Sequence, residues 1–368
     1  MTRVVVAPDS FKGTITAGDA ATALAAGWRS VRADDELVLR PMADGGEGTL
    51  DAIAAATPEA TRVPVTVTGP DDRPVETHWL LLPDGSGVVE LALTSGLTLL
   101  DELRPWSAHT IGFGEAIAAA LDHGVARLVL AIGGSATTDG GTGMLAALGA
   151  RFSPFADTHP RGPADVERIT GVELSALRAL PRGGVLALTD VDSPLTGKRG
   201  AAAVFGPQKG LVDPEAVERA DAALRHLATL IAAAADGAAP ADPATQGSGA
   251  AGGTGFGLLV WGATLSSGAA AVADTVGLDA ALTGADLLIT GEGRFDGQTA
   301  AGKVAHEASC RADALGVPRA LVAGAIEAEP AGFGAAVSLA ALAGTPDAAM
   351  AEPARWLHAA GFQLAQTL

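Results

Sequence analysis

Short apolar runs alternate with polar, glycine-bearing segments along the chain. Residues 4–7 are apolar at successive positions, a pattern typical of a strand buried on both faces of a parallel sheet. Residues 16–28 begin with Thr and carry Asp three positions later, so a capped helix is expected there. Residues 36–42 predict a second strand, and another helix is expected from Thr49. This alternation predicts a parallel α/β fold.

The pattern changes near Thr68. Residues 62–68, 74–82 and 87–93 read as strands with short turns between them, which predicts an antiparallel meander. Alternation of helix and strand then returns, with a helix at 114–122 and strands at 127–132, 185–189, 286–290 and 319–323. A chain of 368 residues with such breaks is expected to form two domains.

Composition limits the classes of function. The net charge of -18, without any basic run, argues against nucleic acid as a partner. Acidic small ligands would need local Lys, Arg, backbone N–H groups or a metal ion. No apolar run approaches the ~20 residues of a membrane span, and no signal-peptide pattern follows Met1. Cys310 is the sole cysteine, which favours a reducing cytoplasm. Whether the chain forms a homo-oligomer is left open.

Acidic residues mixed with glycine follow five of the apolar runs. Ligands of open parallel sheets bind outside the carboxyl ends of the strands. Carboxylates placed there can hold Mg²⁺ or accept a proton from a hydroxyl, and glycine-rich loops can present N–H groups to phosphate. Together these features favour phosphoryl transfer. The five residues are Asp9, Asp44, Asp139, Asp190 and Glu292.

The most informative single loop is Gly-Gly-Ser-Ala-Thr-Thr-Asp-Gly-Gly at 133–141, since an ordinary turn needs fewer glycines and no hydroxyl run. Three lysines, Lys12, Lys209 and Lys303, lie beside Gly in polar loops. Each alone reads as a solvated surface residue, whereas three in so acidic a chain suggest an anion site. Residues 232–257 are rich in Ala, Gly and Pro, and two interpretations stay open: a flexible linker, or a ligand loop at 252–257.

Several familiar sites are missing from the sequence. There is no G-x-x-x-x-G-K-[ST] phosphate loop, no G-x-G-x-x-G after the first strand, and no protein-kinase signature. The seven His residues show no pair at zinc-ligand spacing. Ser135 lacks the G-x-S-x-G context of a hydrolase nucleophile.

Seven ordered motifs resemble the bacterial type-1 glycerate kinase family along nearly the whole chain. They are APDSFKGTITA (7–17), PMADGGEGT (41–49), TSGL (94–97), GGSATTDGGTGML (133–145), TDVDSPLTGKRGAAAVFGPQKG (189–210), GSGAAGGTGFGL (247–258) and ADLLITGEGRFDGQTAAGK (285–303). Two positions depart from the family pattern. Ser193 stands where Asn is usual, which puts any substrate contact there in doubt, and Phe295 replaces a smaller apolar residue, which affects packing.

The resemblance implies ATP and D-glycerate as substrates, 2-phosphoglycerate as product, and Mg²⁺. It also implies an α/β fold of two domains, in which a mixed α/β domain is inserted into a discontinuous Rossmann-like parallel-sheet domain. The pattern breaks near Thr68 and Ala285 agree with this division. We therefore expect the Rossmann-like domain to comprise residues 1–67 plus 285–368, and the inserted domain residues 68–284.

The expected site lies in the cleft between the two domains. Asp190 is the first candidate for the base that accepts the glycerate proton, with Asp44 next, and Lys12 or Lys209 would neutralise the transferring phosphoryl group. Asp192 and Glu292 are the expected metal ligands. The residues expected to bind substrate or nucleotide are Asp9, Ser10, Gly45, Gly46, Ser95, Gly133, Gly134, Ser135, Thr137, Asp139, Gly140, Gly253, Gly255, Gly291, Asp296 and Lys303.

The sequence also leaves other activities open. A kinase of the same build could act on hydroxypyruvate or tartronate, or could form 3-phosphoglycerate. A non-catalytic sensor of sugar acids would bind without forming ADP. An NAD-dependent dehydrogenase is disfavoured by the missing dinucleotide fingerprint.

Overall fold

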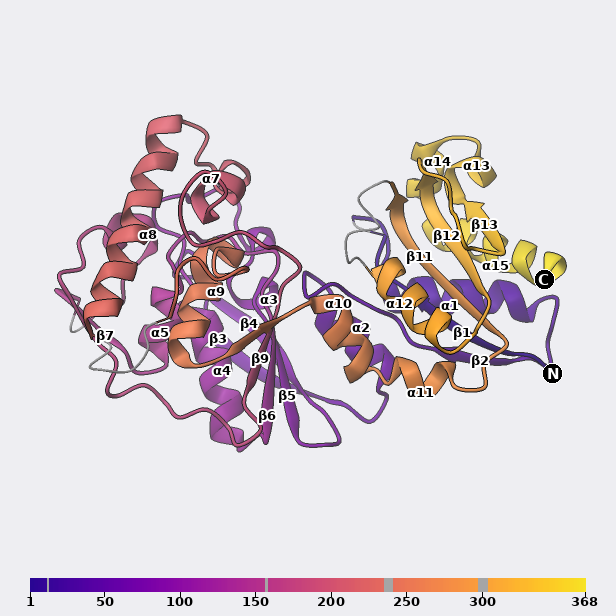
Figure 1. Cartoon of the computed structure of the whole chain (residues 1–368), viewed down its shortest axis with the longest axis horizontal. Helices are drawn as coiled ribbons and strands as arrows, with labels where there is room; N and C mark the ends of the chain where they lie inside the picture. The colour runs from indigo at the N-terminus through magenta and orange to yellow at the C-terminus, as the bar shows by residue number, and fades with distance from the viewer. Residues whose placement is uncertain (12, 156–157, 235–240, 297–303) are drawn as a thin grey trace. The chain divides into compact units, whose positions relative to one another are not determined.

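The computed structural model describes residues 1–11, 13–155, 158–234, 241–296 and 304–368. The chain divides into two compact units (Figure 1). Unit 1 comprises Met1–Asp44, Asp51–Pro58 and Ser267–Leu368, and unit 2 comprises Gly45–Leu50 and Glu59–Ser266.

Unit 1 is built on a five-stranded, wholly parallel sheet. Val4, Val5 and Val6 of an interior strand, which has a neighbour on each side, are all buried, so side chains on both faces of the sheet are covered, as expected for an unbroken apolar run. The order of the strands is β13 (Ala335–Ser338), β12 (Arg319–Ile326), β11 (Leu287–Phe295), β1 (Arg3–Pro8) and β2 (Glu36–Leu39).

Helices cover the sheet of unit 1. The first, α1 (Ala17–Arg29), packs against α15 (Pro353–Thr367), and both share one apolar core with β1, β11 and β12. Thr16 caps α1 as predicted, because its hydroxyl accepts from the N–H of Asp19 at 3.1 Å. The other helices are α2 (Thr49–Ala56), which crosses the boundary at Leu50, α10 (Gly268–Thr275), α11 (Leu278–Leu282), α12 (Val304–Ala314), α13 (Leu339–Ala343) and α14 (Pro346–Ala351).

Unit 2 contains a six-stranded mixed sheet. Its first four strands are parallel, and its last two continue as an antiparallel meander, as the sequence predicted. The order is β10 (Thr264–Ser266), β9 (Val185–Leu188), β6 (Arg127–Ala131), β5 (Ser86–Glu90), β4 (Pro74–Leu81) and β3 (Thr61–Thr68). A separate small sheet pairs β7 (Arg151–Ser153) with β8 (Gly171–Glu173).

A large apolar core of Leu, Val, Ile and Ala holds unit 2 together, and its aromatic members are Trp79, Phe113, Phe152, Phe256 and Trp261. The helices around it are α3 (Ala92–Ser95), η1 (Leu97–Leu99), α4 (Ile111–His123), α5 (Thr142–Ala147), α6 (Gly162–Val166), α7 (Ala201–Phe205), η2 (Pro207–Lys209), α8 (Pro214–Ala234) and α9 (Ala250–Trp261). None of the helices in the described ranges is both long and apolar enough to cross a membrane.

The predicted fold class, α/β with a parallel-sheet part and a mixed α/β part, is confirmed. The boundaries between the two units differ from the domain boundaries expected from the sequence. Residues 59–67 lie in unit 2 because β3 hydrogen-bonds along β4, and residues 267–284 lie in unit 1 with α10 and α11. That the chain folds as an inserted domain within a discontinuous one stays a prediction.

One predicted loop is a strand in the structure. The polar segment 291–295 was expected to follow a strand ending at Thr290, but β11 continues through it to Phe295. The extension pairs Glu292, Arg294 and Phe295 with residues of β12. Hydrogen bonding to a neighbouring strand has therefore outweighed the local preference of Gly and charged residues for turns. Glu292 consequently lies within a strand and not at its end.

Candidate functional site

The glycine-rich loop at 133–141 follows β6 and is buried along most of its length. Asp139 holds it in place. The Asp139 carboxylate is fully buried and accepts five hydrogen bonds: two from Thr110, one from the Thr137 hydroxyl, and one each from the N–H groups of Gly141 and Gly143. With its oxygens used in this way, Asp139 organises the loop and the start of α5.

The loop at 45–46 packs directly on this glycine-rich loop. The N–H of Gly133 donates to the carbonyl of Gly45 at 3.1 Å. A Cβ added at Gly133 would lie 2.5 Å from Cα of Gly46, so the two backbones approach more closely than any other residue would allow. The structure therefore brings together Gly45, Gly46 and Gly133, three of the residues predicted to bind substrate or nucleotide, although the first two are far from the third in the sequence.

Ser95 and the residues after it form a third side of the same loop. The carbonyl of Ser95 accepts from the N–H of Ala136 at 2.9 Å, and the carbonyl of Gly134 accepts from the N–H of Leu97 at 3.0 Å. The Ser95 side chain is buried, and its Oγ has no hydrogen-bond partner among the described residues.

The beginning of α9 supplies the fourth side. The N–H of Gly140 donates to the carbonyl of Gly252 at 3.0 Å. Gly252 has a φ of +68°, and a Cβ there would lie 1.9 Å from the carbonyl oxygen of Thr137. Residues 252–257 are therefore packed against the glycine-rich loop, with left-handed backbone angles at Gly252 and Gly253, and are not a free linker. That they bind a ligand stays a prediction. Gly253 also contacts Gly140, whereas Gly255 packs on the carbonyl of Gly247.

Lys209 reaches this loop from the end of η2. Its Nζ donates to Ser135 Oγ at 2.7 Å and to the carbonyl of Thr137, and the residue is only 2% exposed. Burial lowers the pKa of the Lys209 amine to about 7, against the opposing attraction of Asp139. Lys209 is therefore a buried lysine, unlike most lysines in surface loops, whose side chains are solvated.

Asp190 and Asp192 follow β9 and are exposed. Asp192 forms an ion pair with Arg199, with Oδ2 and Nη2 2.7 Å apart. Ser193, the residue that departs from the family pattern, is buried, and its carbonyl accepts from the N–H of Gly249 at 3.0 Å. Its backbone thus anchors the segment that leads into α9.

In unit 1, predicted residues gather at the carboxyl end of β1. The N–H of Asp9 donates to the carbonyl of Gly291 at 2.8 Å, and the N–H of Ser10 donates to Asp9 Oδ1 at 2.6 Å. Asp44 is half-buried beyond β2, Glu292 is buried within β11, and Asp296 follows the last residue of that strand. Lys12 and Lys303 lie outside the described residues.

Within the described ranges, no three His, Cys, Asp or Glu side chains are grouped closely enough to hold a metal ion. The chemistry of Asp192 and Glu292 still suits Mg²⁺, which takes oxygen ligands and commonly combines one or two carboxylates with phosphate oxygens and water. Their assignment as metal ligands stays a prediction.

Sequence reasoning missed Glu90. This buried carboxylate accepts from the N–H of Gly48 at 2.9 Å and from the N–H of Leu50 at 2.8 Å, at the start of α2. Glu90 thereby fixes the glycine loop that contacts Gly133. The signal was available, because Glu90 ends an apolar strand like the five chosen acidic residues, but the strand was predicted to run on to residue 93.

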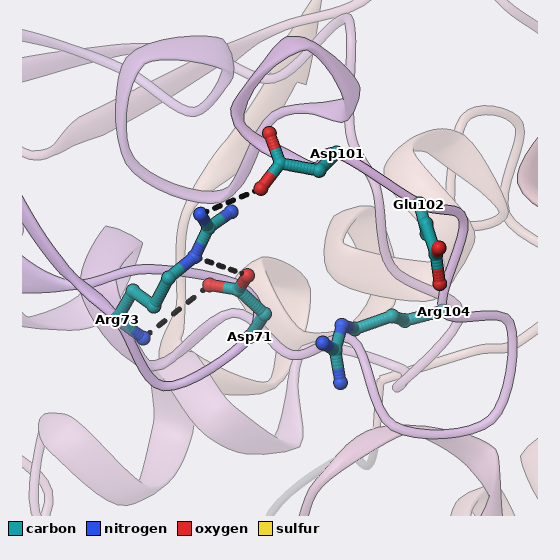
Figure 2. Close-up of a pocket in the computed structure, with 5 residues that line it drawn as sticks. All are labelled: Asp71, Arg73, Asp101, Glu102 and Arg104. Carbon is teal, nitrogen blue, oxygen red and sulfur yellow. Dashed lines mark hydrogen bonds and ion pairs between the residues drawn. The ribbon is translucent and has the colours of Figure 1, made fainter.

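A surface pocket of about 270 Å³ also lies in unit 2 (Figure 2). Arg73 forms ion pairs with Asp71 and Asp101 across it, and these contacts raise the pKa of Arg73. Its lining residues are Asp71, Arg73, Asp101, Glu102 and Arg104. None of them was predicted from the sequence as part of the site.

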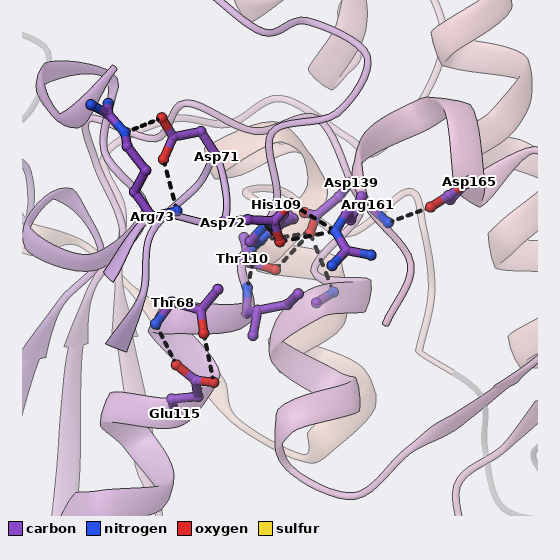
Figure 3. Close-up of polar contacts among 12 residues, drawn as sticks. Thr68, Asp71, Asp72, Arg73, His109, Thr110, Glu115, Asp139, Arg161 and Asp165 are labelled. Carbon is purple, nitrogen blue, oxygen red and sulfur yellow. Dashed lines mark hydrogen bonds and ion pairs between the residues drawn. The ribbon is translucent and has the colours of Figure 1, made fainter. Parts of the chain in front are cut away.

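A buried histidine lies beside the residues that hold Asp139 (Figure 3). His109 precedes Thr110, and its Nε2 is 3.3 Å from Asp72 Oδ1. Asp72 also forms an ion pair with Arg161 at 2.9 Å. Burial lowers the pKa of His109, although Asp139 and Asp72 oppose this effect and Arg161 adds to it. The neutral imidazole is therefore favoured.

A buried glycine-rich loop at the end of a parallel strand, in an α/β chain of two units, is typical of small-molecule kinases of α/β fold. The model of the glycerate kinase family matches residues 4–368. The chain belongs to the glycerate kinase family.

Individual relatives agree with this assignment. A glycerate kinase from Bacillus subtilis (strain 168) is 40% identical over 331 residues, covering 88% of this chain and 85% of the relative. A glycerate 2-kinase from Escherichia coli (strain K12) is 38% identical over 308 residues, covering 82% and 80%. A crystal structure of a Salmonella typhimurium LT2 protein described as a glycerate kinase 2 is similar with a TM-score of 0.86 and 38% identity, covering 100% of this chain and 98% of that one.

Proposed function

We propose that the protein transfers the γ-phosphoryl group of ATP to the 2-hydroxyl of D-glycerate and forms 2-phosphoglycerate and ADP. The observation that carries this proposal is the glycine-rich loop at 133–141, which is fixed at the end of β6 by Asp139 and packed between the loop at 45–46 and the start of α9. The name of the Escherichia coli relative, a glycerate 2-kinase, supports the choice of the 2-hydroxyl.

The proposed chemistry depends mainly on positioning of the reactants and on charge neutralisation. Backbone N–H groups of the glycine loops would bind phosphate oxygens, and Mg²⁺, when bound by Asp192 or Glu292 together with the phosphates, would supply further positive charge. Lys12 or Lys209 is assigned the same role, and Lys303 is proposed to bind substrate or nucleotide. The remaining predicted residues of unit 1, Asp9, Ser10, Gly291 and Asp296, are proposed to bind substrate or nucleotide.

The substrate hydroxyl must lose its proton as its oxygen attacks phosphorus. Asp190 and Asp44 are the carboxylates that the sequence proposed for this task. The structure adds a third group of suitable chemistry, the buried amine of Lys209 beside the Ser135 hydroxyl.

Phosphorus NMR of the product made from D-glycerate and ATP tests the proposal directly, because it reports turnover and the position of the new phosphate together. The expected result is the resonance of 2-phosphoglycerate with one equivalent of ADP. A 3-phosphoglycerate signal would contradict the proposed regiochemistry and leave the kinase activity intact.

A panel of hydroxypyruvate, tartronate and L-glycerate under the same conditions tests the substrate. Faster turnover of any of these than of D-glycerate would reassign the acceptor. Binding of D-glycerate without ADP formation, with Mg²⁺ and ATP present, would instead favour the non-catalytic sensor.

A further inference from the structure

The Lys209 amine is buried without a carboxylate at ion-pair distance among the described residues. The charged group of the described chain that acts on it is Asp139, and the Asp139 oxygens already accept from Thr110, Thr137, Gly141 and Gly143. A buried ammonium without a direct counter-ion is unfavourable. The environment therefore makes the neutral amine, which carries a lone pair, accessible at neutral pH.

The direct neighbours of this amine are a hydroxyl and a carbonyl. A carbonyl can only accept, so the contact with Thr137 fixes one N–H of Lys209 in either protonation state. The hydroxyl of Ser135 can reverse its role. It accepts from the ammonium form and donates to the neutral form over the same 2.7 Å contact. The pair thus has the geometry of a proton relay with a defined direction.

Ser135 lies in the glycine-rich loop that the proposed function assigns to substrate and nucleotide. Its backbone is held by the bridge to Gly96, so the hydroxyl is fixed relative to the loop. By contrast, Asp190 lies exposed after β9, outside the buried glycine-rich loop.

We propose that Ser135 and Lys209 together accept the proton of the substrate hydroxyl, with Ser135 as the relay and the Lys209 amine as the final acceptor. The proposal rests on the proposed function for its substrate. As the substrate O–H bond breaks, its proton passes to Ser135 Oγ while Ser135 gives its own proton to Lys209 Nζ. The substrate oxygen forms a bond to the γ-phosphorus, and the bond to the bridging oxygen breaks with its electron pair leaving on ADP. The reverse relay later returns the proton to water.

The first test needs no substrate. The chain contains four lysines, Lys12, Lys198, Lys209 and Lys303, so NMR of protein labelled at the lysine side chains gives few signals. The Lys209→Met variant assigns the signal of Lys209 by its loss. Burial predicts that this signal titrates with a pKa of about 7. A Lys209 signal that keeps the chemical shift of the ammonium form well above pH 7 would overturn the proposal.

The second test is kinetic. Turnover of the wild-type protein is expected to fall below pH 7 as Lys209 becomes protonated, and Lys209→Met and Ser135→Ala are each expected to lower kcat by about 100-fold or more with little change in KM. Ser135→Thr keeps a hydroxyl and is expected to recover much of the loss. Lys198→Met, at an exposed position of the loop after β9, is the matched control.

Folded Lys209→Met or Ser135→Ala protein, verified by circular dichroism, with kcat within a few-fold of wild type would overturn the proposal. So would loss of the low-pH limb in Asp190→Asn, because the titrating base would then be the carboxylate. Should the wild-type protein fail to phosphorylate D-glycerate with ATP, the proposed function itself fails, while the lysine titration still reports whether the amine is a neutral acceptor.

Discussion

Thr110 and Asp139 form a two-point contact across 29 residues of sequence: the N–H and the hydroxyl of Thr110 donate to Asp139 Oδ2 at 2.9 and 2.7 Å. The same Thr110 hydroxyl accepts from the N–H of Met144 at 2.9 Å. One buried carboxylate and one hydroxyl thus join the start of α4, the glycine-rich loop and α5. The shape of the candidate site depends on this junction.

Replacing Asp139 by Asn tests the junction. The amide keeps the size of the side chain but points N–H₂ at groups that donate to the present carboxylate, leaving buried donors unpaired. We expect the free energy of unfolding to fall by about 3 kcal/mol or more, measured by urea denaturation. Asp122→Asn removes an exposed ion pair with Arg178 and serves as control, with an expected loss under about 1 kcal/mol. Equal losses in the two variants would contradict the assigned role of Asp139.

Gly133→Ala tests the close approach of two backbones. The new Cβ would lie 2.5 Å from Cα of Gly46 and 3.3 Å from the carbonyl oxygen of Gly45, so one of the loops must move. We expect a loss of stability of about 1–3 kcal/mol and a marked rise in the KM for ATP. Gly171→Ala is a matched control, because its Cβ meets Ser153 only at 3.8 Å. A Gly133 variant with the KM and stability of the control would show that the contact is unimportant.

Glu90→Gln tests the carboxylate that sequence reasoning missed. Glutamine retains one acceptor oxygen but presents an amide to the second N–H and removes the negative charge near the start of α2. We expect a loss of about 1–2 kcal/mol in the free energy of unfolding. The exposed Glu76 provides the comparison, and Glu76→Gln is expected to change stability by less than about 0.5 kcal/mol. Indistinguishable denaturation midpoints for the two variants would contradict the role of Glu90 in holding the loop at the start of α2.

The buried His109 predicts a pH dependence of stability. Burial lowers its pKa in the folded protein below the ordinary histidine value of about 6.5 that holds in the unfolded chain. On acidification the unfolded chain therefore binds the proton first, so the free energy of unfolding falls as the pH drops below 6.5 toward the folded pKa. His109→Gln is expected to flatten this part of the stability–pH curve, measured by urea denaturation between pH 5 and 8. The exposed His159→Gln variant should keep the wild-type slope, and a slope unchanged in both would contradict the prediction.

The order and type of the main elements could be read from the sequence. The unbroken apolar run at Val4, Val5 and Val6 forms the buried interior strand β1, and Thr16 with Asp19 marks the start of α1. Such signals are local, because a buried strand or a capped helix is specified by residues within a few positions of one another. The glycine-rich loop at 133–141 was found for the same reason.

Tertiary structure alone decided what the individual polar groups do. Asp139 and Asp190 look alike in sequence, since both follow an apolar strand, yet one is buried with five donors and the other is exposed. Glu292 lies inside β11 because a neighbouring strand was available to pair with it. Lys209 acquired a buried hydroxyl partner 74 positions away in the chain. Burial and partners of this kind depend on which distant segments pack together, and the ionisation and reactivity of a side chain follow from that packing, not from its neighbours in sequence.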